Sequence, residues 1–447
     1  MNLDTAVAAI AGIDGAGFDL GERPQAWPDF PVAEYRQRYA RLAALMDAEG
    51  FDALVLTQEE AVRYLSGYNS VIWAVGRWLP TVLVAARDPR RSALIASSFD
   101  AGCASGTAWV PTVDTYGSVE EIPAKVREHL AAAGAADERV GYEFGQGSFM
   151  AVPQHLAAAL TGRAGGATFR PAGGPAGGGA NGAGTTGGAF TPPRDAGRLI
   201  SALRMLKSPL EIERIRRSVG AAVAGYQAGL AAATAGMTEK DLVAVIGSTM
   251  YRSGATAGTK PLFVNCVSGR TRYPLVDSPA SDNVIAEGDI VFVDGGGACD
   301  GYVSDILRLI GVGRIRPEDR RYAEVAAEAT QVMVDTVRPG VRVSELIGAA
   351  AKHVAAAGVT DPVGEIAGHG IGLELWERPL IRAHDDPGDD VAVQPGMVLC
   401  LEPILAPPHP GGGLAGIFVF EQQVLVTPDG CEVLSGAVPG RLWEADT

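Results

Sequence analysis

The chain has 447 residues, of which 47% are hydrophobic, so it is long enough for a large core and for two domains. Its 37 Lys and Arg against 52 Asp and Glu give a net charge of −15, which argues against nucleic acid or an anionic membrane as the main partner. An acidic N-terminus and the lack of any run of about eighteen apolar residues predict neither a secretory signal nor a membrane span. The five cysteines form no CxxC pair, which is typical of reduced thiols in a cytoplasmic protein.

An extension of residues 1–30 precedes a segment, residues 31–160, in which helical and strand patterns alternate. Such alternation predicts an α/β domain. Apolar residues at helical spacing predict a helix that ends at Gly50, and a second helix is predicted at 122–134. The predicted strands lie at 51–57, 64–68, 81–86 and 92–97.

Residues 161–197 consist mainly of Gly, Ala, Pro and Thr. A segment with so little to bury cannot offset its ordering entropy, so we expect a flexible loop or linker. This segment separates the first domain from residues 198–447.

The second domain is predicted to be mixed α+β. Ser208 as N-cap, Pro209 at the first helical position and Glu211 in the first turn mark the start of a long helix. Further helices are predicted from Glu239 and at 317–336 and 343–357, and strands at 261–268, 289–294, 302–309, 397–404 and 417–427.

Two carboxylates occupy the predicted strands around a glycine-rich turn, VFVDGGGACDGYVSDILR. If 289–294 and 302–309 form a hairpin, Asp294 and Asp305 can face the same side of the sheet. Two adjacent carboxylates repel, and a divalent cation between them removes that conflict. On these two residues alone, a metal site and a pair of unrelated surface carboxylates are equally good interpretations.

Three later segments add ligand-type residues. His369 lies between glycines in AGHGIG, which predicts a tight turn that presents the imidazole, and Glu402 and Glu421 interrupt apolar strands. A carboxylate in an apolar strand costs several kcal/mol, on the order of 2–7, unless it is paired, protonated or coordinated. Four carboxylates and one imidazole suit Mn, Fe, Co or Zn, and bridging lets them hold two ions that activate water and polarise a carbonyl.

The flanking residues of these ligand candidates form a recognisable pattern. Its parts are Lys207-Ser208-Pro209 with Glu211, Gly288-Asp289, Gly301-Tyr302-x-Ser304-Asp305-Ile306-x-Arg308, His369-Gly370-x-Gly372-Leu373, Gly396-Met397, Glu402-Pro403 and Glu421. Residues 198–430 thereby resemble the superfamily of creatinase, prolidase, aminopeptidase P and methionine aminopeptidase, whose catalytic domain has the pita-bread fold. Residues 35–160, with Tyr64-Leu65-Ser66-Gly67-Tyr68, resemble the N-terminal domain of the creatinase and prolidase branch.

This resemblance implies a dinuclear centre, with Mn²⁺ as the first expectation. Its implied ligands are Asp294, Asp305, His369, Glu402 and Glu421. In this scheme Glu402 also shuttles the proton, His369 belongs to the catalytic set and Glu421 bridges the ions. The resemblance implies a homodimer as well, in which the region around Trp73 and Arg77 lines the partner's active site and contacts substrate.

The sequence departs from the peptidases of this superfamily at three substrate-side positions that carry histidine there. Asp277 stands seventeen residues before Asp294, Trp376 opens the motif Trp376-Glu377-Arg378-Pro379, and Glu365 stands four residues before His369. A tryptophan can donate a hydrogen bond but cannot shuttle a proton. His384 and His409, two of only six histidines, are candidates for replacing the missing imidazoles, although solvated loop histidines are the commoner case.

Three hypotheses follow. The first is a dinuclear metallohydrolase that cleaves an amide-type C–N bond, Xaa-Pro-like, in a small peptide or amino-acid derivative. The second is a metal-dependent lyase or non-peptide amide hydrolase that acts on a small carboxylate, and the missing histidines favour it. The third, an inactive binding module, predicts lost ligands, which the sequence does not show. Cys299 and Cys400 are interpreted as buried packing residues, because the superfamily uses no sulfur ligand.

Overall fold

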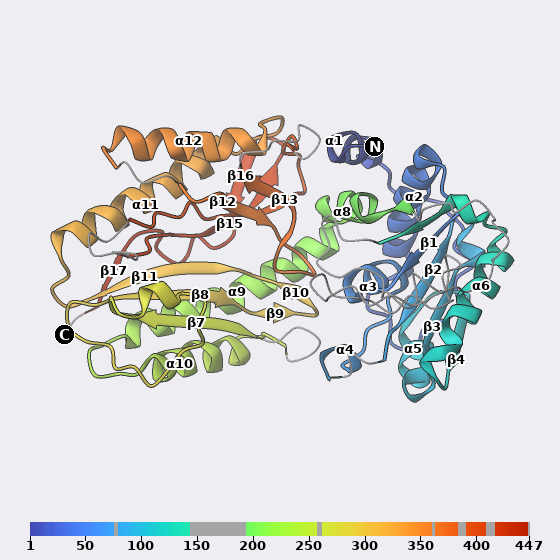
Figure 1. Cartoon of the computed structure of the whole chain (residues 1–447), viewed down its shortest axis with the longest axis horizontal. Coiled ribbons are helices and arrows are strands. Elements are labelled where there is room, and N and C mark those ends of the chain that lie inside the picture. The colour runs from blue at the N-terminus through green and yellow to red at the C-terminus, as the bar shows by residue number, and fades with distance from the viewer. Residues whose placement is uncertain are drawn as a thin grey trace, which may run out of the picture. The chain divides into compact units, whose positions relative to one another are not determined.

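The computed structural model describes residues 1–75, 79–143, 194–256, 262–359, 363–382, 390–407 and 416–445. The chain divides into two units, one of Gly12–Ile200 and one that joins Met1–Ala11 to Ser201–Thr447 (Figure 1). None of the helices in these ranges combines the length and the apolar character needed to cross a bilayer. Of the glycine-rich segment predicted at 161–197, only residues 194–197 are described: Arg194 and Asp195 form a strand, and Gly197 begins a helix.

The first unit is an α/β domain, as predicted. Its described strands form one sheet in the order β4-β3-β2-β1-β5-β6. The strands are β1 (Ala53–Leu56), β2 (Val82–Ala86), β3 (Ala93–Ser97), β4 (Thr112–Tyr116), β5 (Val140–Tyr142) and β6 (Arg194–Asp195). The helices are α2 (Val32–Glu49), α3 (Glu59–Ser66), α4 (Ile72–Val75), α5 (Ala101–Thr107) and α6 (Ile122–Ala133). The helix α6 packs Val126 and Leu130 against Val55 and Val84 of the sheet, which explains the short apolar runs in the sequence.

One element of this unit differs from the sequence prediction. Residues 64–68 are not a strand, because residues 64–66 are the last residues of helix α3 and Gly67 caps it in the left-handed conformation, with φ of 76°. The acidic first turn, Glu59 and Glu60, and the glycine C-cap were local signals for a helix. By contrast, Gly50 ends α2 with φ of 69°, as predicted.

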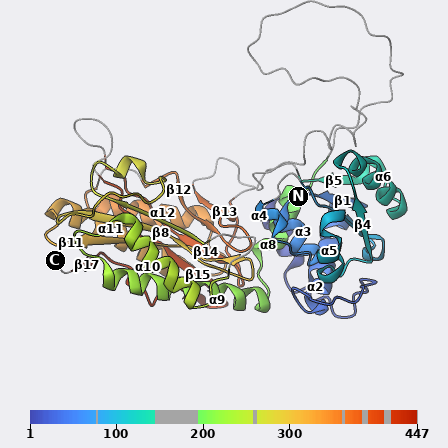
Figure 2. The same cartoon turned by 90° about the horizontal axis from the view of Figure 1, so that it is seen from below.

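The second unit is α+β and contains two larger sheets (Figures 1 and 2). Their orders are β17-β11-β8-β7 and β13-β12-β14-β15-β16, and β9 and β10 form a small hairpin. The strands are β7 (Phe263–Ser268), β8 (Ile290–Gly296), β9 (Ala298–Cys299), β10 (Tyr302–Val303), β11 (Ile306–Val312), β12 (Ile366–Gly370), β13 (Glu377–Arg382), β14 (Val398–Leu401), β15 (Gln422–Thr427), β16 (Gly430–Val433) and β17 (Trp443–Ala445). The helices are α8 (Gly197–Met205), α9 (Pro209–Ala232), α10 (Glu239–Arg252), α11 (Pro317–Thr336) and α12 (Val343–Ala356).

The helices α9 and α10 cover one face of the β7–β8–β11 layer. They approach closely because Gly229 has no side chain, and a Cβ there would lie 2.4 Å from a side-chain carbon of Ile246. Val291 and Val293 of β8 face this helical core. Since side chains alternate along a strand, Asp294 projects from the opposite face. The helices α11 and α12 pack against the second sheet, so the space between the two sheets receives the polar side chains.

The N-terminal extension begins with a helix, α1 (Leu3–Ile10), that belongs to the second unit. Its apolar residues Leu3, Val7 and Ile10 are buried. The Asp4 carboxylate accepts hydrogen bonds from Arg342 Nη1 at 2.7 Å and from the Ala392 N–H at 2.9 Å. The sequence-predicted extension of residues 1–30 is therefore not uniform, because its first part is a packed element of the larger unit.

Candidate metal centre

Asp294 and Asp305 are brought together by an antiparallel pair of strands, as predicted. In this pair Leu307 of β11 lies opposite Asp294 of β8. Ile306 and Ile310 face the helical core, so Asp305, just before β11, projects to the same side as Asp294. Carboxylate oxygens of Asp294, Asp305 and Glu421 all lie within 4.8 Å of one another.

The second sheet supplies the remaining side chains from one face. Cys400 of β14 lies opposite His369 of β12 and opposite Gln423 of β15, and directly opposed residues share a face. The period of two places Glu402 and Glu421 on that face as well. A ring nitrogen of His369, Cys400 Sγ and an oxygen of Glu421 form a second group within 4.8 Å.

Three local predictions for these residues need correction. His369 is in strand β12 rather than in a turn, while Glu402 follows β14 directly and Glu421 directly precedes β15. The flanking glycines allow strands to approach closely: a Cβ at Gly368 would lie 2.1 Å from the Cys400 carbonyl oxygen, and one at Gly370 would lie 2.3 Å from that of Arg378. The glycine pattern that suggested a turn thus reflects close strand packing.

Several polar atoms at the centre are buried without a hydrogen-bond partner among the described residues. They are Asp305 Oδ1, His369 Nε2 and both carboxylate oxygens of Glu421. His369 is 0% exposed, and its Nδ1 lies 2.9 Å from the Gly370 carbonyl oxygen, which only a protonated Nδ1 can satisfy. Its Nε2 therefore presents a lone pair toward Asp305 Oδ2 at 3.9 Å and Glu402 Oε1 at 3.5 Å.

The electrostatics of the centre indicate missing positive charge. Burial raises the pKa of Asp294 to about 7, with a further contribution from the charge of Asp277, and burial beside Asp294 raises that of Glu402 to about 8. Burial and neighbouring carboxylates also raise the pKa values of Asp305 and Glu421 well above their usual range. Burial lowers the pKa of His369 to about 4, so its imidazole is neutral at pH near 7.

These residues fit divalent cations. Uncompensated buried carboxylates and a neutral imidazole with a free lone pair are the donors that such ions require. Four ionised carboxylates carry the negative charge that two divalent ions balance. Glu421 is the side chain common to both groups of three, which suits a bridging ligand.

Arg308 supports the centre from behind. Its guanidinium is buried and donates to the carbonyl oxygens of Leu307, Glu421 and Val438 and to Gln422 Oε1. Its contact with the Glu421 carbonyl holds the backbone of a bridging candidate in place. The side-chain oxygen of Gln423, which sequence reasoning missed, accepts the Asp305 N–H at 3.2 Å.

A buried ionic cluster fixes the chain that follows His369. The Glu377 carboxylate accepts from Arg204, from Lys207 Nζ at 3.1 Å and from the Leu373 N–H at 2.9 Å. Glu377 therefore closes the loop between β12 and β13. The only sequence signal for this role was the position of Glu377 next to Trp376, where peptidases of the superfamily carry histidine. Its cationic partners are about 170 residues away in the chain.

The Glu377 cluster predicts a specific acid sensitivity. Burial alone would raise the pKa of Glu377, yet Arg204 and Lys207 lower it to about 2. A lowered pKa stabilises the fold above the unfolded-state value near 4.5, and that stability is lost as pH falls toward 2. We expect Glu377→Gln to destabilise the protein by about 3–5 kcal/mol near pH 7, since it removes the buried carboxylate that pairs with Lys207 and leaves Arg204 with Glu374 as its carboxylate partner. The deficit should shrink near pH 3, as measured by urea denaturation.

The exposed Glu287 provides the matched control, since Glu287→Gln should change stability little at either pH. A deficit for Glu377→Gln that stays constant between the two pH values would contradict the assignment of a low pKa to Glu377.

The substrate-side candidates that the structure describes have different surroundings. Trp376 is 38% exposed and stacks on the imidazole of His369, with ring centroids 5.0 Å apart and an interplanar angle of 20°. Asp277 is exposed and close enough to Asp294 for its charge to raise the pKa of that carboxyl group. The side chain of Glu365 is 82% exposed, 3.9 Å from Arg382, and makes no contact with the five ligand candidates among the described contacts.

The remaining substrate-side candidates cannot be placed at the centre. Trp73 belongs to the first unit, where its ring packs edge-on against that of Tyr68, with ring centroids 4.7 Å apart. Arg77, His384 and His409 lie outside the described residues.

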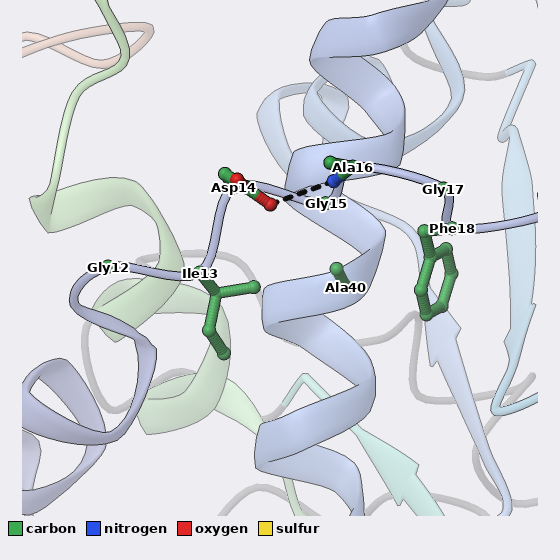
Figure 3. Close-up of a pocket in the computed structure, with 8 residues that line it drawn as sticks. All are labelled: Gly12, Ile13, Asp14, Gly15, Ala16, Gly17, Phe18 and Ala40. Carbon is green, nitrogen blue, oxygen red and sulfur yellow. Dashed lines mark hydrogen bonds between the residues drawn. The ribbon is translucent and has the colours of Figure 1, made fainter.

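A separate surface cavity of about 420 Å³ lies in the first unit, between the loop Gly12–Phe18 and Ala40 of α2 (Figure 3). The carboxylate of Asp14 accepts the Ala16 N–H at 2.8 Å, as the dashed line shows. The one charged side chain that lines the cavity therefore stabilises the turn, and none of the ligand candidates lines the cavity.

Comparisons with known proteins agree with this architecture. The profile of metallopeptidase family M24 matches residues 213–428, and that of the creatinase/prolidase N-terminal domain matches residues 38–176. A Xaa-Pro dipeptidase from Pyrococcus furiosus is 32% identical over 237 residues, which are 53% of this chain and 65% of the relative. A probable dipeptidase from Mycobacterium tuberculosis is also 32% identical over 237 residues, which are 52% of this chain and 59% of that relative. The aligned part thus spans a little under two thirds of these curated relatives.

Solved structures share the fold over most of the chain. A Xaa-Pro dipeptidase from Bacillus anthracis superposes with a TM-score of 0.71 at 23% identity, covering 92% of this chain and all of the other. The prolidase from Pyrococcus horikoshii gives a TM-score of 0.70 at 22% identity, covering 89% of this chain and 98% of the other. Residues 213–428 therefore carry a domain of metallopeptidase family M24, residues 38–176 match the creatinase/prolidase N-terminal domain, and the solved structures share this two-domain fold.

Proposed function

We propose that the chain is a dinuclear metal-dependent hydrolase that cleaves the C–N bond of a small Xaa-Pro-like peptide or amino-acid derivative. The observation that carries this proposal is the pair of buried donor groups that share Glu421. We assign Asp294, Asp305, His369, Glu402 and Glu421 as ligands of two divalent ions, with Mn²⁺ as the first expectation. The relatives named Xaa-Pro dipeptidase support the choice of bond.

When bound, the two ions supply a water of lowered pKa and polarise the substrate carbonyl. Glu402 accepts the proton of the attacking water and passes it to the leaving nitrogen, so that a carboxylate and an amine are released. Burial raises the pKa of Glu402, and bound cations would lower it again, so that its carboxylate is ionised when it accepts the proton. His369 stays neutral. Its Nδ1–H donates to the Gly370 carbonyl oxygen, so the lone pair of Nε2 is available to a cation.

Metal removal provides the direct test. We expect about two ions per chain by elemental analysis and, after chelation, loss of nearly all hydrolysis of Xaa-Pro dipeptides, with recovery on adding Mn²⁺. Hydrolysis that survives complete chelation would contradict the proposal. A peptide with Ala in place of Pro serves as the specificity control.

A second candidate function uses the same centre on a small non-peptide carboxylate, by amide hydrolysis or elimination. The stacking of Trp376 on His369 favours it, because an indole cannot transfer a proton where peptidases of the superfamily carry histidine. The names of the relatives favour the peptidase, so this candidate ranks second. Two bound ions without any dipeptide cleavage would reverse that order.

The assembly and location of the protein follow the resemblance and the composition. We propose a homodimer in which the region around Trp73 and Arg77 lines the partner's active site. We also propose a cytoplasmic protein, because none of the five cysteines is paired and none belongs to a CxxC motif.

A further inference from the structure

The two donor groups at the centre differ in chemistry. Asp294, Asp305 and Glu421 offer only carboxylate oxygens, whereas the other group combines a His369 nitrogen, Cys400 Sγ and a Glu421 oxygen. Carboxylates suit hard ions such as Mn²⁺, while thiolate and imidazole suit softer ions such as Zn²⁺. The two metal positions therefore need not prefer the same ion.

Cys400 is built into the site by strand geometry rather than by chance proximity. It is 0% exposed and lies directly opposite His369 in the β12–β14 ladder, with its side chain on the face that carries Glu402. The stacked ring of Trp376 covers the imidazole of His369, and the Gly368 backbone lies against the Cys400 carbonyl. The sulfur is thereby held within 4.8 Å of a ring nitrogen of His369 and an oxygen of Glu421.

A second, independent observation at the same place points to a ligand. His369 Nε2 and both oxygens of Glu421 are buried and make no hydrogen bond with any described residue. An uncompensated nitrogen and carboxylate beside a thiol form a set of three donors of the types found in catalytic zinc sites. A cation there also displaces the thiol proton to bulk water, since a coordinating thiol is deprotonated outright.

We infer that Cys400 is a sulfur ligand of the metal position formed with His369 and Glu421, which makes the centre asymmetric, with one soft and one hard position. This inference rests on the metal centre of the proposed function. It revises the interpretation of Cys400 as a packing residue. The signal in the sequence was its position two residues before Glu402, on the same face of a strand.

The wild-type protein loaded with Zn²⁺ alone tests the inference by X-ray absorption spectroscopy. We expect a Zn–S distance of about 2.3 Å in addition to nitrogen and oxygen neighbours at about 2.0–2.2 Å. With Co²⁺ alone, a sulfur-to-cobalt charge-transfer band should appear in the near-ultraviolet. A spectrum fitted by nitrogen and oxygen neighbours only would overturn the inference, and no variant has to fold for that result.

Variants sharpen the result. Cys400→Ser should lose the charge-transfer band and bind Zn²⁺ about 10- to 100-fold more weakly, with a smaller change for Mn²⁺. Cys431→Ser is the matched control, because its sulfur is half-buried and lies 3.5 Å from the Val334 carbonyl oxygen, so it should keep the band. A Cys400→Ser variant that keeps the band would overturn the inference.

The outcomes also separate this inference from the proposed function. A sulfur band in a protein that cleaves no dipeptide leaves the inference standing and removes the peptidase. Chelator-sensitive dipeptide cleavage without any sulfur ligation leaves the peptidase standing and removes the inference.

Discussion

The Glu402→Gln variant is expected to lose about 10²- to 10⁴-fold in kcat on Xaa-Pro dipeptides, the range that general acid–base groups contribute. The amide keeps the size and an oxygen donor of the carboxylate, but it cannot accept and return a proton. The fold should not suffer, because burial disfavours a charge at this position, as the raised pKa of Glu402 shows, and the amide is uncharged and of nearly the same size. Steady-state kinetics and thermal denaturation measure the two effects.

Metal content must be measured in the same samples of the Glu402→Gln variant, because Glu402 is also assigned as a metal ligand. Glu287→Gln, at an exposed site, is the control of equal chemistry and should keep kcat. A Glu402→Gln enzyme that is metal-loaded and as active as the wild type would remove Glu402 from the mechanism.

The Arg308→Met variant is expected to be destabilised by about 3 kcal/mol or more, because several buried acceptors lose their donor at once. The affected groups are the carbonyl oxygens of Leu307, Glu421 and Val438, and Gln422 Oε1. Since the Glu421 backbone is one of them, metal content should fall together with the free energy of unfolding. Urea denaturation and elemental analysis give the two quantities.

An arginine in an exposed position supplies the comparison for Arg308. Arg252 at the end of α10 is exposed, and Arg252→Met should change stability by less than about 0.5 kcal/mol. If Arg308→Met changed the free energy of unfolding equally little, the hydrogen bonds of the guanidinium would not stabilise the centre.

Elements with local signals were predictable from the sequence. The helix α9 begins with Ser208, Pro209 and Glu211 in a capping box, and α11 spans 317–336 as its periodicity predicts. The hairpin that joins Asp294 to Asp305 followed from two apolar runs around a glycine-rich turn. In each case the determining residues are neighbours in the chain.

Features that depend on partners far along the chain were not predictable. Glu402 and Glu421 lie just outside their strands because ladder pairing, not apolar character, determines where β14 ends and where β15 begins. The glycines beside His369 indicated a turn, since the strands that pack against them are not visible in the local sequence. The role of Glu377 depends on Arg204 and Lys207, and the register that places Cys400 opposite His369 is a property of the sheet.

The docking of α1 also affects the order in which the chain folds. Asp4 is synthesised well before its partners Arg342 and Ala392, which are 338 and 388 positions later in the chain. Closing so large a loop costs entropy and is slow, and all residues between Asp4 and Ala392 must be synthesised first. Until then Leu3, Val7 and Ile10 have no surface of their own unit to cover. While those residues are being added, the nascent chain carries an apolar helix without its partner, which is the kind of segment that chaperones bind.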